Sequence, residues 1–186
     1  MRTLLAICVV TLPLLAVGGC TKHPGTVITR DACSLVPKQE VEAVQQTHLN
    51  DVKSSERSDG AFVVSQCFYT AAEFSKSVNL ALVQTDPKQP SRRSPKDFWK
   101  EKFGPYEGAG KQQTRTKENE EKEERTAPKK IDGLGDAAYW VSNRFGGVLY
   151  VLKGDAFISI GLGGTTQEDT KLEKSKLLAQ KALQRL

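Results

Sequence analysis

An uncharged opening segment constrains this chain more than any other feature. Only Arg2 carries a side-chain charge before position 20, and the run from Thr3 to Gly19 is dominated by Leu, Val, Ala and Ile. This pattern is typical of an export signal peptide, which is removed from the mature protein. A retained membrane span is the alternative, but the run contains Pro13 and is shorter than the roughly 20 apolar residues that a span needs. We therefore exclude residues 1–19 from the expected fold.

The end of this segment resembles the lipobox of bacterial lipoproteins. Leu15, Ala16 and Val17 lead into a pair of glycines directly before Cys20. The resemblance implies that the Cys20 thiol receives a diacylglyceryl group and becomes the new N-terminus. Residues 20–30 then form a lipidated tether on the outer face of the cell membrane, or on the periplasmic side of the outer membrane in a cell with two membranes. Several acyl chains anchor firmly, because each buried methylene contributes about 0.8 kcal/mol.

Cysteine usage predicts one disulfide bond. Cys8 leaves with the signal segment and Cys20 is expected to be lipidated, so Cys33 and Cys67 remain. Two thiols in an oxidising envelope favour a bridge. A metal pair is the competing interpretation, but the chain lacks the further Cys and His ligands that a zinc site needs. We expect neither a metal nor another cofactor.

The charge balance of the remaining chain is only mildly basic. Arg2 is the only charged side chain lost, which leaves 26 Lys and Arg against 22 Asp and Glu. An excess of this size, spread along the chain, does not indicate nucleic-acid binding. The length matches one ordinary domain over residues 31–186 behind the tether.

Apolar periodicity and capping residues predict an α+β domain. Helices are expected over 32–36 with a continuation from Pro37, over 95–103, and from a Thr165–Glu168 capping box to the C-terminus; strands are expected over 61–70, 77–85, 137–142, 148–152 and 156–162. Tight turns make the first two strands a hairpin and the last three an antiparallel meander. The result is a two-layer fold, with a sheet of about five strands packed against the N-terminal and C-terminal helices.

Three other stretches are expected to lie outside these elements. The polar residues 47–60 are expected to be a loop, and the glycines at 161, 163 and 164 are interpreted as a plain strand-to-helix turn. Residues 111–130 hold seven cations and five glutamates with almost nothing apolar. Without an apolar stripe this stretch cannot dock, so we interpret it as a solvated helix or a charged excursion between two halves of the domain.

Several short motifs resemble a known family. They are the lipobox, Cys33-Ser-Leu-Val at a helix start, Cys67-Phe-Tyr in a strand, and the Ile-Asp-Gly-Leu-Gly-Asp-Ala-Ala segment at 131–138. Together they resemble small exported bacterial lipoproteins of unknown function that are abundant in actinobacteria. The resemblance spans most of the mature chain and implies a two-layer α/β domain with one disulfide. It transfers no catalytic residue, and the 111–130 excursion departs from the family pattern.

The favoured function is a non-catalytic binding or accessory module of the envelope, which holds a lipid, a cell-wall fragment or a partner protein. Its speculative ligand-binding residues are Trp99, Tyr106, Tyr139 and Trp140. Core packing is the alternative role for these aromatics. Because Tyr139 and Trp140 are adjacent on a strand, at least one of them points inward.

An immunity lipoprotein that inhibits a secreted envelope hydrolase is the alternative function, with residues 111–130 as the loop that enters the active site. An enzyme is not expected, because His23 lies in the tether and His48 at a helix exit, and neither stands beside a nucleophile. The acidic residues at 40, 42, 132 and 136 would act as a catalytic pair only if the fold brought two of them together.

Overall fold

A computed structural model describes residues 29–89, 93–107, 127–144, 146–164 and 167–186. The signal segment 1–19, the lipidation site Cys20, His23, Thr165 and most of the charged excursion lie outside these ranges. The predictions made for them stay predictions. Within the described ranges, no helix combines the length and the apolar character needed to cross a membrane.

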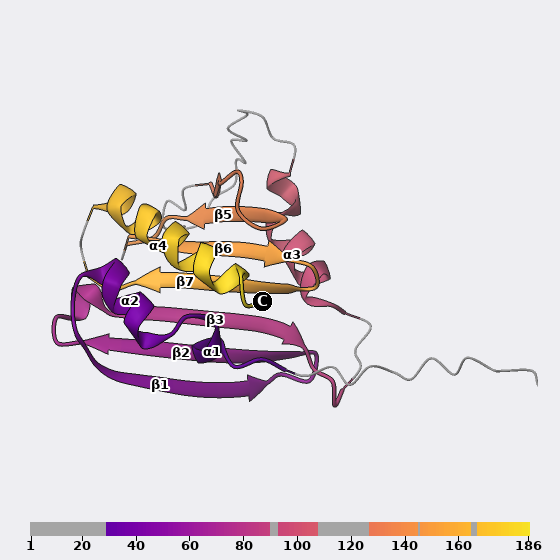
Figure 1. Ribbon diagram of the computed structural model, residues 1–186. Helices are drawn as coiled ribbons and strands as arrows, with labels where there is room; N and C mark the ends of the chain where they lie inside the picture. Colours follow the sequence, from indigo (N-terminus) through magenta and orange to yellow (C-terminus); the bar gives the residue numbers. More distant parts are fainter. Residues whose placement is uncertain (1–28, 90–92, 108–126, 145, 165–166) are drawn as a thin grey trace, which may run out of the picture.

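Seven antiparallel strands of the described chain form one sheet, in the order β1-β2-β3-β7-β6-β5-β4 (Figure 1). They are β1 Leu49–Ser58, β2 Phe62–Ala71, β3 Val78–Thr85, β4 Lys129–Lys130, β5 Ala137–Val141, β6 Val148–Lys153 and β7 Ala156–Leu162. The predicted hairpin is confirmed as β2–β3 and the predicted meander as β5–β6–β7. Pairing of β3 with β7 joins these two units into one sheet.

The expected count of about five strands is wrong, because both edge strands were missed. β1 occupies most of the 47–60 stretch that was expected to be a loop, and only Leu49 in it is buried. β4 lies at the opposite edge, within the range expected to be the charged excursion. Edge strands that face solvent commonly carry charged and polar residues, which guard against pairing with other chains. The apolar alternation used to predict strands is therefore absent from both.

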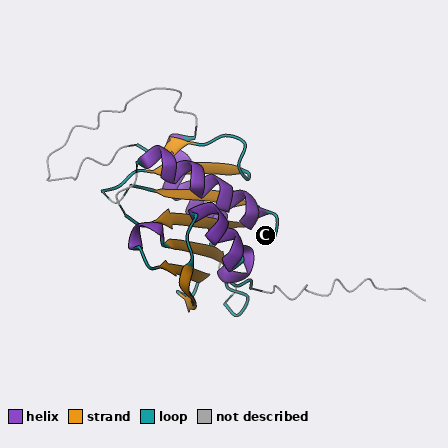
Figure 2. Ribbon diagram, turned by 60° about the vertical axis from the view of Figure 1, so that its left-hand side comes forward, coloured by secondary structure: helices purple, strands orange, loops and turns teal. Residues whose placement is uncertain are grey.

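Helices cover one face of the sheet over its central strands and the other face in part, and most of the edge strand β1 lies outside the helices (Figures 1 and 2). The α-helices are α1 Ala32–Leu35, α2 Lys38–Gln45, α3 Pro95–Phe103 and α4 Glu168–Leu183, and the two 3₁₀ turns are η1 Phe74–Lys76 and η2 Gly104–Tyr106. α1, α2 and α4 enclose the main core with one face, whereas α3 packs a smaller aromatic core on the other. The predicted two-layer arrangement is thus incomplete, because α3 adds a partial third layer.

The caps at the first and third helices follow the sequence signals. Asp31 Oδ1 accepts a hydrogen bond from the Cys33 N–H at 2.8 Å at the start of α1. Ser94 and Asp97 form a reciprocal capping box at the start of α3. Pro37 stands at the N-cap of α2 rather than inside a continuing helix, so the N-terminal helix is split in two. These caps fix where α1 and α3 begin on the sheet.

Three contacts tie α1 to β2. Cys33 and Cys67 are joined by the predicted disulfide, with a Cα–Cα distance of 4.9 Å. The Ala32 N–H donates to Ser65 Oγ at 2.9 Å, and the Tyr69 hydroxyl donates to the Val36 carbonyl at 2.6 Å. Burial raises the pKa of the Tyr69 hydroxyl, so it remains a donor at physiological pH. The first helix is therefore clamped onto the covered face of the sheet.

The start of α4 differs from the expected capping box. Glu168 is the first residue of the helix rather than its third, and Gln167 stands at the N-cap. The Glu168 carboxylate accepts hydrogen bonds from Trp140 Nε1 and Ser142 Oγ instead, which ties α4 to β5. Lys171, in the first turn of α4, is only 1% exposed although its side chain is charged.

We expect the Glu168→Gln substitution to make the free energy of unfolding less dependent on pH in the acid range. The hydrogen bonds from Ser142 and Trp140 lower the pKa of Glu168 from its ordinary value of 4.5. A carboxylate whose pKa is lower in the folded chain stabilises the fold above its unfolded pKa, and this stabilisation is lost as the pH falls through the folded pKa. Urea denaturation at a series of pH values should show E168Q less stable at neutral pH but less sensitive below about pH 4.5. Parallel curves for the two proteins would contradict this role.

Candidate functional site

The four aromatic residues proposed to bind a ligand do not form one site. Trp99, Tyr139 and Trp140 are each 1% exposed, and only Tyr106, on η2, is well exposed at 38%. Tyr139 and Trp140 point to opposite faces of β5, and both faces are covered at this position. Core packing, the alternative role, therefore holds for Trp99, Tyr139 and Trp140.

Two of these aromatics belong to the small core under α3. The Trp99 ring lies 4.5 Å from the Phe103 ring between centroids, and Phe103 stacks on Tyr139 at 4.7 Å with an interplanar angle of 6°. Burial raises the pKa of Tyr139, which suits a packing role rather than a chemical one. α3 covers this face beside the start of β2 and leaves the other end of the same face open.

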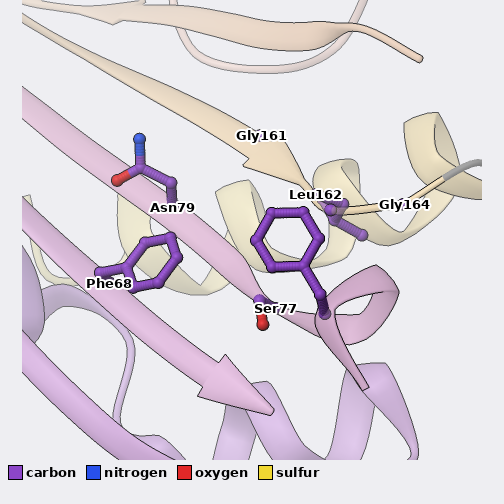
Figure 3. Close-up of a pocket in the computed structure, with 8 residues that line it drawn as sticks. Phe68, Ser77, Asn79, Gly161, Leu162 and Gly164 are labelled. Carbon is purple, nitrogen blue, oxygen red and sulfur yellow. The ribbon is translucent and has the colours of Figure 1, made fainter. Parts of the chain in front are cut away.

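A hollow of about 370 Å³ lies on the open end of this face, between the sheet and η1. Its lining residues are Phe68, Phe74, Ser77, Asn79, Gly161, Leu162, Gly163 and Gly164. Phe68, Asn79 and Gly161 are direct neighbours across β2, β3 and β7 and form the floor. Figure 3 shows the Phe68 ring and the Asn79 amide side by side, next to the bare backbone of Gly161.

The walls of this hollow are almost wholly apolar. All eight lining residues lie in the described part of the chain, and none of them is charged. Phe74 is 68% exposed and Phe68 is 38% exposed, so two phenyl rings that line the same hollow remain open to solvent. Ser77 is only 2% exposed and its hydroxyl accepts the Ala71 N–H at 3.1 Å, so the Asn79 amide is the main polar group available. The hollow suits an apolar group with at most one or two hydrogen bonds.

Two glycines create the space. A Cβ atom at Gly163 would lie 2.1 Å from the Phe74 carbonyl oxygen, so only glycine lets η1 approach the turn after β7. A Cβ at Gly161 would meet only Val148 Cγ2, at 3.7 Å, so this position tolerates a side chain. The glycines interpreted as a plain turn therefore also form a wall and the floor of the hollow. The sequence does not reveal this site, because the site depends on the packing of η1 against the turn after β7. No local sequence pattern indicates that contact.

The acidic residues considered for catalysis are all engaged in ion pairs. Each has its own basic partner: Glu40 with Arg185, Glu42 with Lys38 and His48, Asp132 with Lys130, and Asp136 with Lys153. His48 is exposed, as expected, and its Nδ1 lies 3.0 Å from Glu42 Oε1. No cluster of three or more His, Cys, Asp or Glu residues suited to a metal occurs in the ranges that the structure describes.

Likeness to known proteins adds nothing to this geometry. The resemblance to exported lipoproteins stays a prediction, and the function has to be argued from the hollow itself. Comparison with protein-family models, with curated proteins and with solved structures found no match to this chain.

Proposed function

We propose that this domain is a non-catalytic envelope module that holds the acyl chain of a lipid in the hollow on its sheet. The observation that carries the proposal is the uncharged, largely apolar lining of the hollow. Transfer of an acyl chain from water to such a surface is favourable by roughly 0.8 kcal/mol for each buried methylene. A volume of 370 Å³ is at the small end of the range for ligand pockets, which suits part of one chain.

The lining favours a lipid over the other two ligand classes. Cell-wall sugars and peptides carry many hydroxyl and amide groups, and each would need a polar partner once it was buried. The hollow offers mainly the Asn79 amide for that purpose. A stable protein partner usually covers about 800 Å² of each surface, whereas among the described lining residues of the hollow the large apolar side chains that are exposed are Phe68 and Phe74.

The position of the hollow agrees with an anchored protein. The backbone of Arg30 pairs with the Gln84 side chain near the end of β3, and Asn79 lies five residues away on the same strand. That separation is about 17 Å along the strand. A tether from Cys20 to Arg30 spans at most about 35 Å when fully extended. A hollow this close to the start of the domain is within reach of the membrane that the predicted anchor would enter.

Filling the floor of the hollow should abolish lipid binding. Gly161→Leu places an apolar side chain where the ligand would lie, at a backbone position that accepts one. We expect this variant to bind cis-parinaric acid, a fluorescent fatty acid, at least about tenfold more weakly than the unsubstituted protein.

Gly104→Leu is the matched control, because a Cβ there would meet nothing within 4 Å and Gly104 does not line the hollow. It should bind the fatty acid like the unsubstituted protein. Equal binding by all three proteins, or no binding by any, would refute the proposal.

Native mass spectrometry of the protein extracted gently from its own envelope tests the same proposal without a chosen ligand. A bound mass of a few hundred daltons beyond the anchor acyl groups is expected. A stoichiometric protein partner in place of that mass would favour an accessory or an inhibitor function, and the identity of the partner would decide between them.

A further inference from the structure

We infer that a second cleft, beside the hollow, binds a phosphate-class oxyanion. This basic cleft has a volume of about 150 Å³ and is lined by Gln45, Glu73, Ser75, Lys76, Leu162, Thr170, Lys171 and Lys174. Its walls come from the end of α2, from η1, from the end of β7 and from the first turns of α4. The volume suits a compact anion and is too small for a folded chain of methylenes.

A buried amide without an acceptor points to a ligand in the basic cleft. Gln45 is 2% exposed, and its Oε1 accepts a hydrogen bond from Lys174 Nζ at 3.1 Å. Because an ammonium group only donates, this contact fixes which end of the amide is oxygen. Gln45 Nε2 is then a buried donor that has no partner among the described residues. Buried donors are nearly always paired in proteins, so this one is expected to face an acceptor oxygen.

The charges around the amide favour an anion as the source of that oxygen. Three lysines and one glutamate line the basic cleft. The carboxylate is already engaged, since Glu73 Oε2 lies 3.4 Å from Lys76 Nζ and Glu73 Oε1 accepts from the Ser75 hydroxyl. Lys174 has no carboxylate within ion-pair distance among the residues that the structure describes. An oxyanion beside Gln45 Nε2 would therefore meet an ammonium group that lacks a counter-charge.

Lys171 has a different role in this cleft. Its Nζ donates to the carbonyl oxygens of Leu162 and Gly164, which fastens the turn after β7 to α4. Burial lowers the pKa of Lys171, because the charged form loses hydration. We therefore assign the direct contact with the anion to Lys174 and Gln45, and not to Lys171.

The basic cleft and the hollow are neighbours. Leu162 lines both, and adjacent residues of η1 line different spaces: Ser75 lines the basic cleft, whereas Phe74 lines the hollow. The oxyanion has two possible sources, a free phosphate or the headgroup of a lipid whose chain occupies the hollow. The oxyanion site itself does not depend on the proposed function, and only the headgroup source rests on it.

The first test uses inorganic phosphate alone and the side-chain amide signals of Gln45 in ¹⁵N-labelled protein. We expect a saturable shift of these signals during a phosphate titration, with sodium chloride as the ionic-strength control. Lys174→Gln should weaken phosphate binding about tenfold, whereas Lys174→Arg, which keeps the cation, should restore most of it. Lys181→Gln, on the same helix but outside the cleft, is the charge-matched control and should bind like the unsubstituted protein. No shift, or the same shift in K174Q, overturns the inference.

The second test separates the two sources with lysophosphatidic acid, which carries one acyl chain and a phosphate monoester. If the oxyanion is the headgroup of a lipid, lysophosphatidic acid should bind about tenfold more tightly than phosphate. Both K174Q and G161L should then weaken the binding of this lipid. For a free phosphate source, the lipid gains nothing over phosphate and G161L has no effect on phosphate binding. Both outcomes support the oxyanion site. Loss of lipid binding in G161L with full retention in K174Q, and no phosphate shift, would refute this site and leave the proposed function intact.

Discussion

Replacing Trp99 with Ala is expected to lower the free energy of unfolding by about 4 kcal/mol, the usual cost of truncating a buried aromatic side chain. The Trp99 side chain is 1% exposed and lies against Phe103, Tyr139 and Phe157, with ring centroids 4.5 to 6.0 Å apart. Trp99 and Phe103, two of the three buried residues of α3, both belong to this small core, so truncating Trp99 removes much of the packing of α3 on the sheet. Urea denaturation followed by circular dichroism measures the effect.

Trp99→Phe is the matched control for this substitution. The Trp99 Nε1–H is buried and has no hydrogen-bond partner in the described part of the chain. Removing an unpaired buried donor relieves a desolvation cost, which offsets part of the lost packing. We therefore expect W99F to cost only about 1 kcal/mol. If W99A instead kept its stability and lost affinity for a bound lipid, Trp99 would be a ligand-binding residue and not a core residue.

Elements with one face in the core could be predicted from the sequence. β3 alternates Val78, Leu80 and Leu82 on its covered face, and each of these residues is at most 1% exposed. The hairpin and the meander follow from such alternation combined with short turns. α3 was predictable from its cap at Ser94 and its buried Trp99 and Phe103. Apolar alternation and capping residues were therefore sufficient to predict an element wherever one of its faces is buried in the core.

Other features of the fold depend on contacts between distant segments. No local signal reports that β3 pairs with β7, because the pairing joins residues 78–83 with residues 157–162. The burial of Lys171 is similar, since its ammonium group lies against Gly146, in the loop between β5 and β6, where a Cβ would be 2.5 Å from Lys171 Nζ. β1 was missed for the opposite reason, because an exposed edge strand has no apolar pattern to detect.

The two spaces on the surface are also invisible to sequence patterns. The hollow depends on Gly161, a residue without a side chain, and on the approach of Phe74 to the turn after β7. The basic cleft brings Gln45 next to Lys174 across 129 positions of the chain. The aromatic residues were instead chosen by type, and type alone does not separate a core tryptophan from an exposed one. A site of this kind is found from geometry and then tested by filling it.

Removing the disulfide with the double substitution Cys33→Ala and Cys67→Ala is expected to lower the free energy of unfolding by about 4 kcal/mol. The bridge closes a loop with a sequence separation of 34, which restricts the unfolded chain in the chain-entropy model. The variant also loses the covalent link between α1 and β2, so α1 is then held by hydrogen bonds and packing alone. Denaturant unfolding of the variant, and of the unsubstituted protein with and without a reducing agent, measures the effect.

Ser65→Ala is the matched control at the same junction. It removes the acceptor of the Ala32 N–H and leaves the bridge intact, so it should cost only about 1 kcal/mol. Reduction of the unsubstituted protein should bring its stability close to that of the double variant, because both then unfold to an open chain. A double variant that lost no more stability than S65A would show that packing of α1, and not the cross-link, holds this end of the domain. A loss near 4 kcal/mol that reduction reproduces would identify the cross-link as the main restraint on this end of the domain.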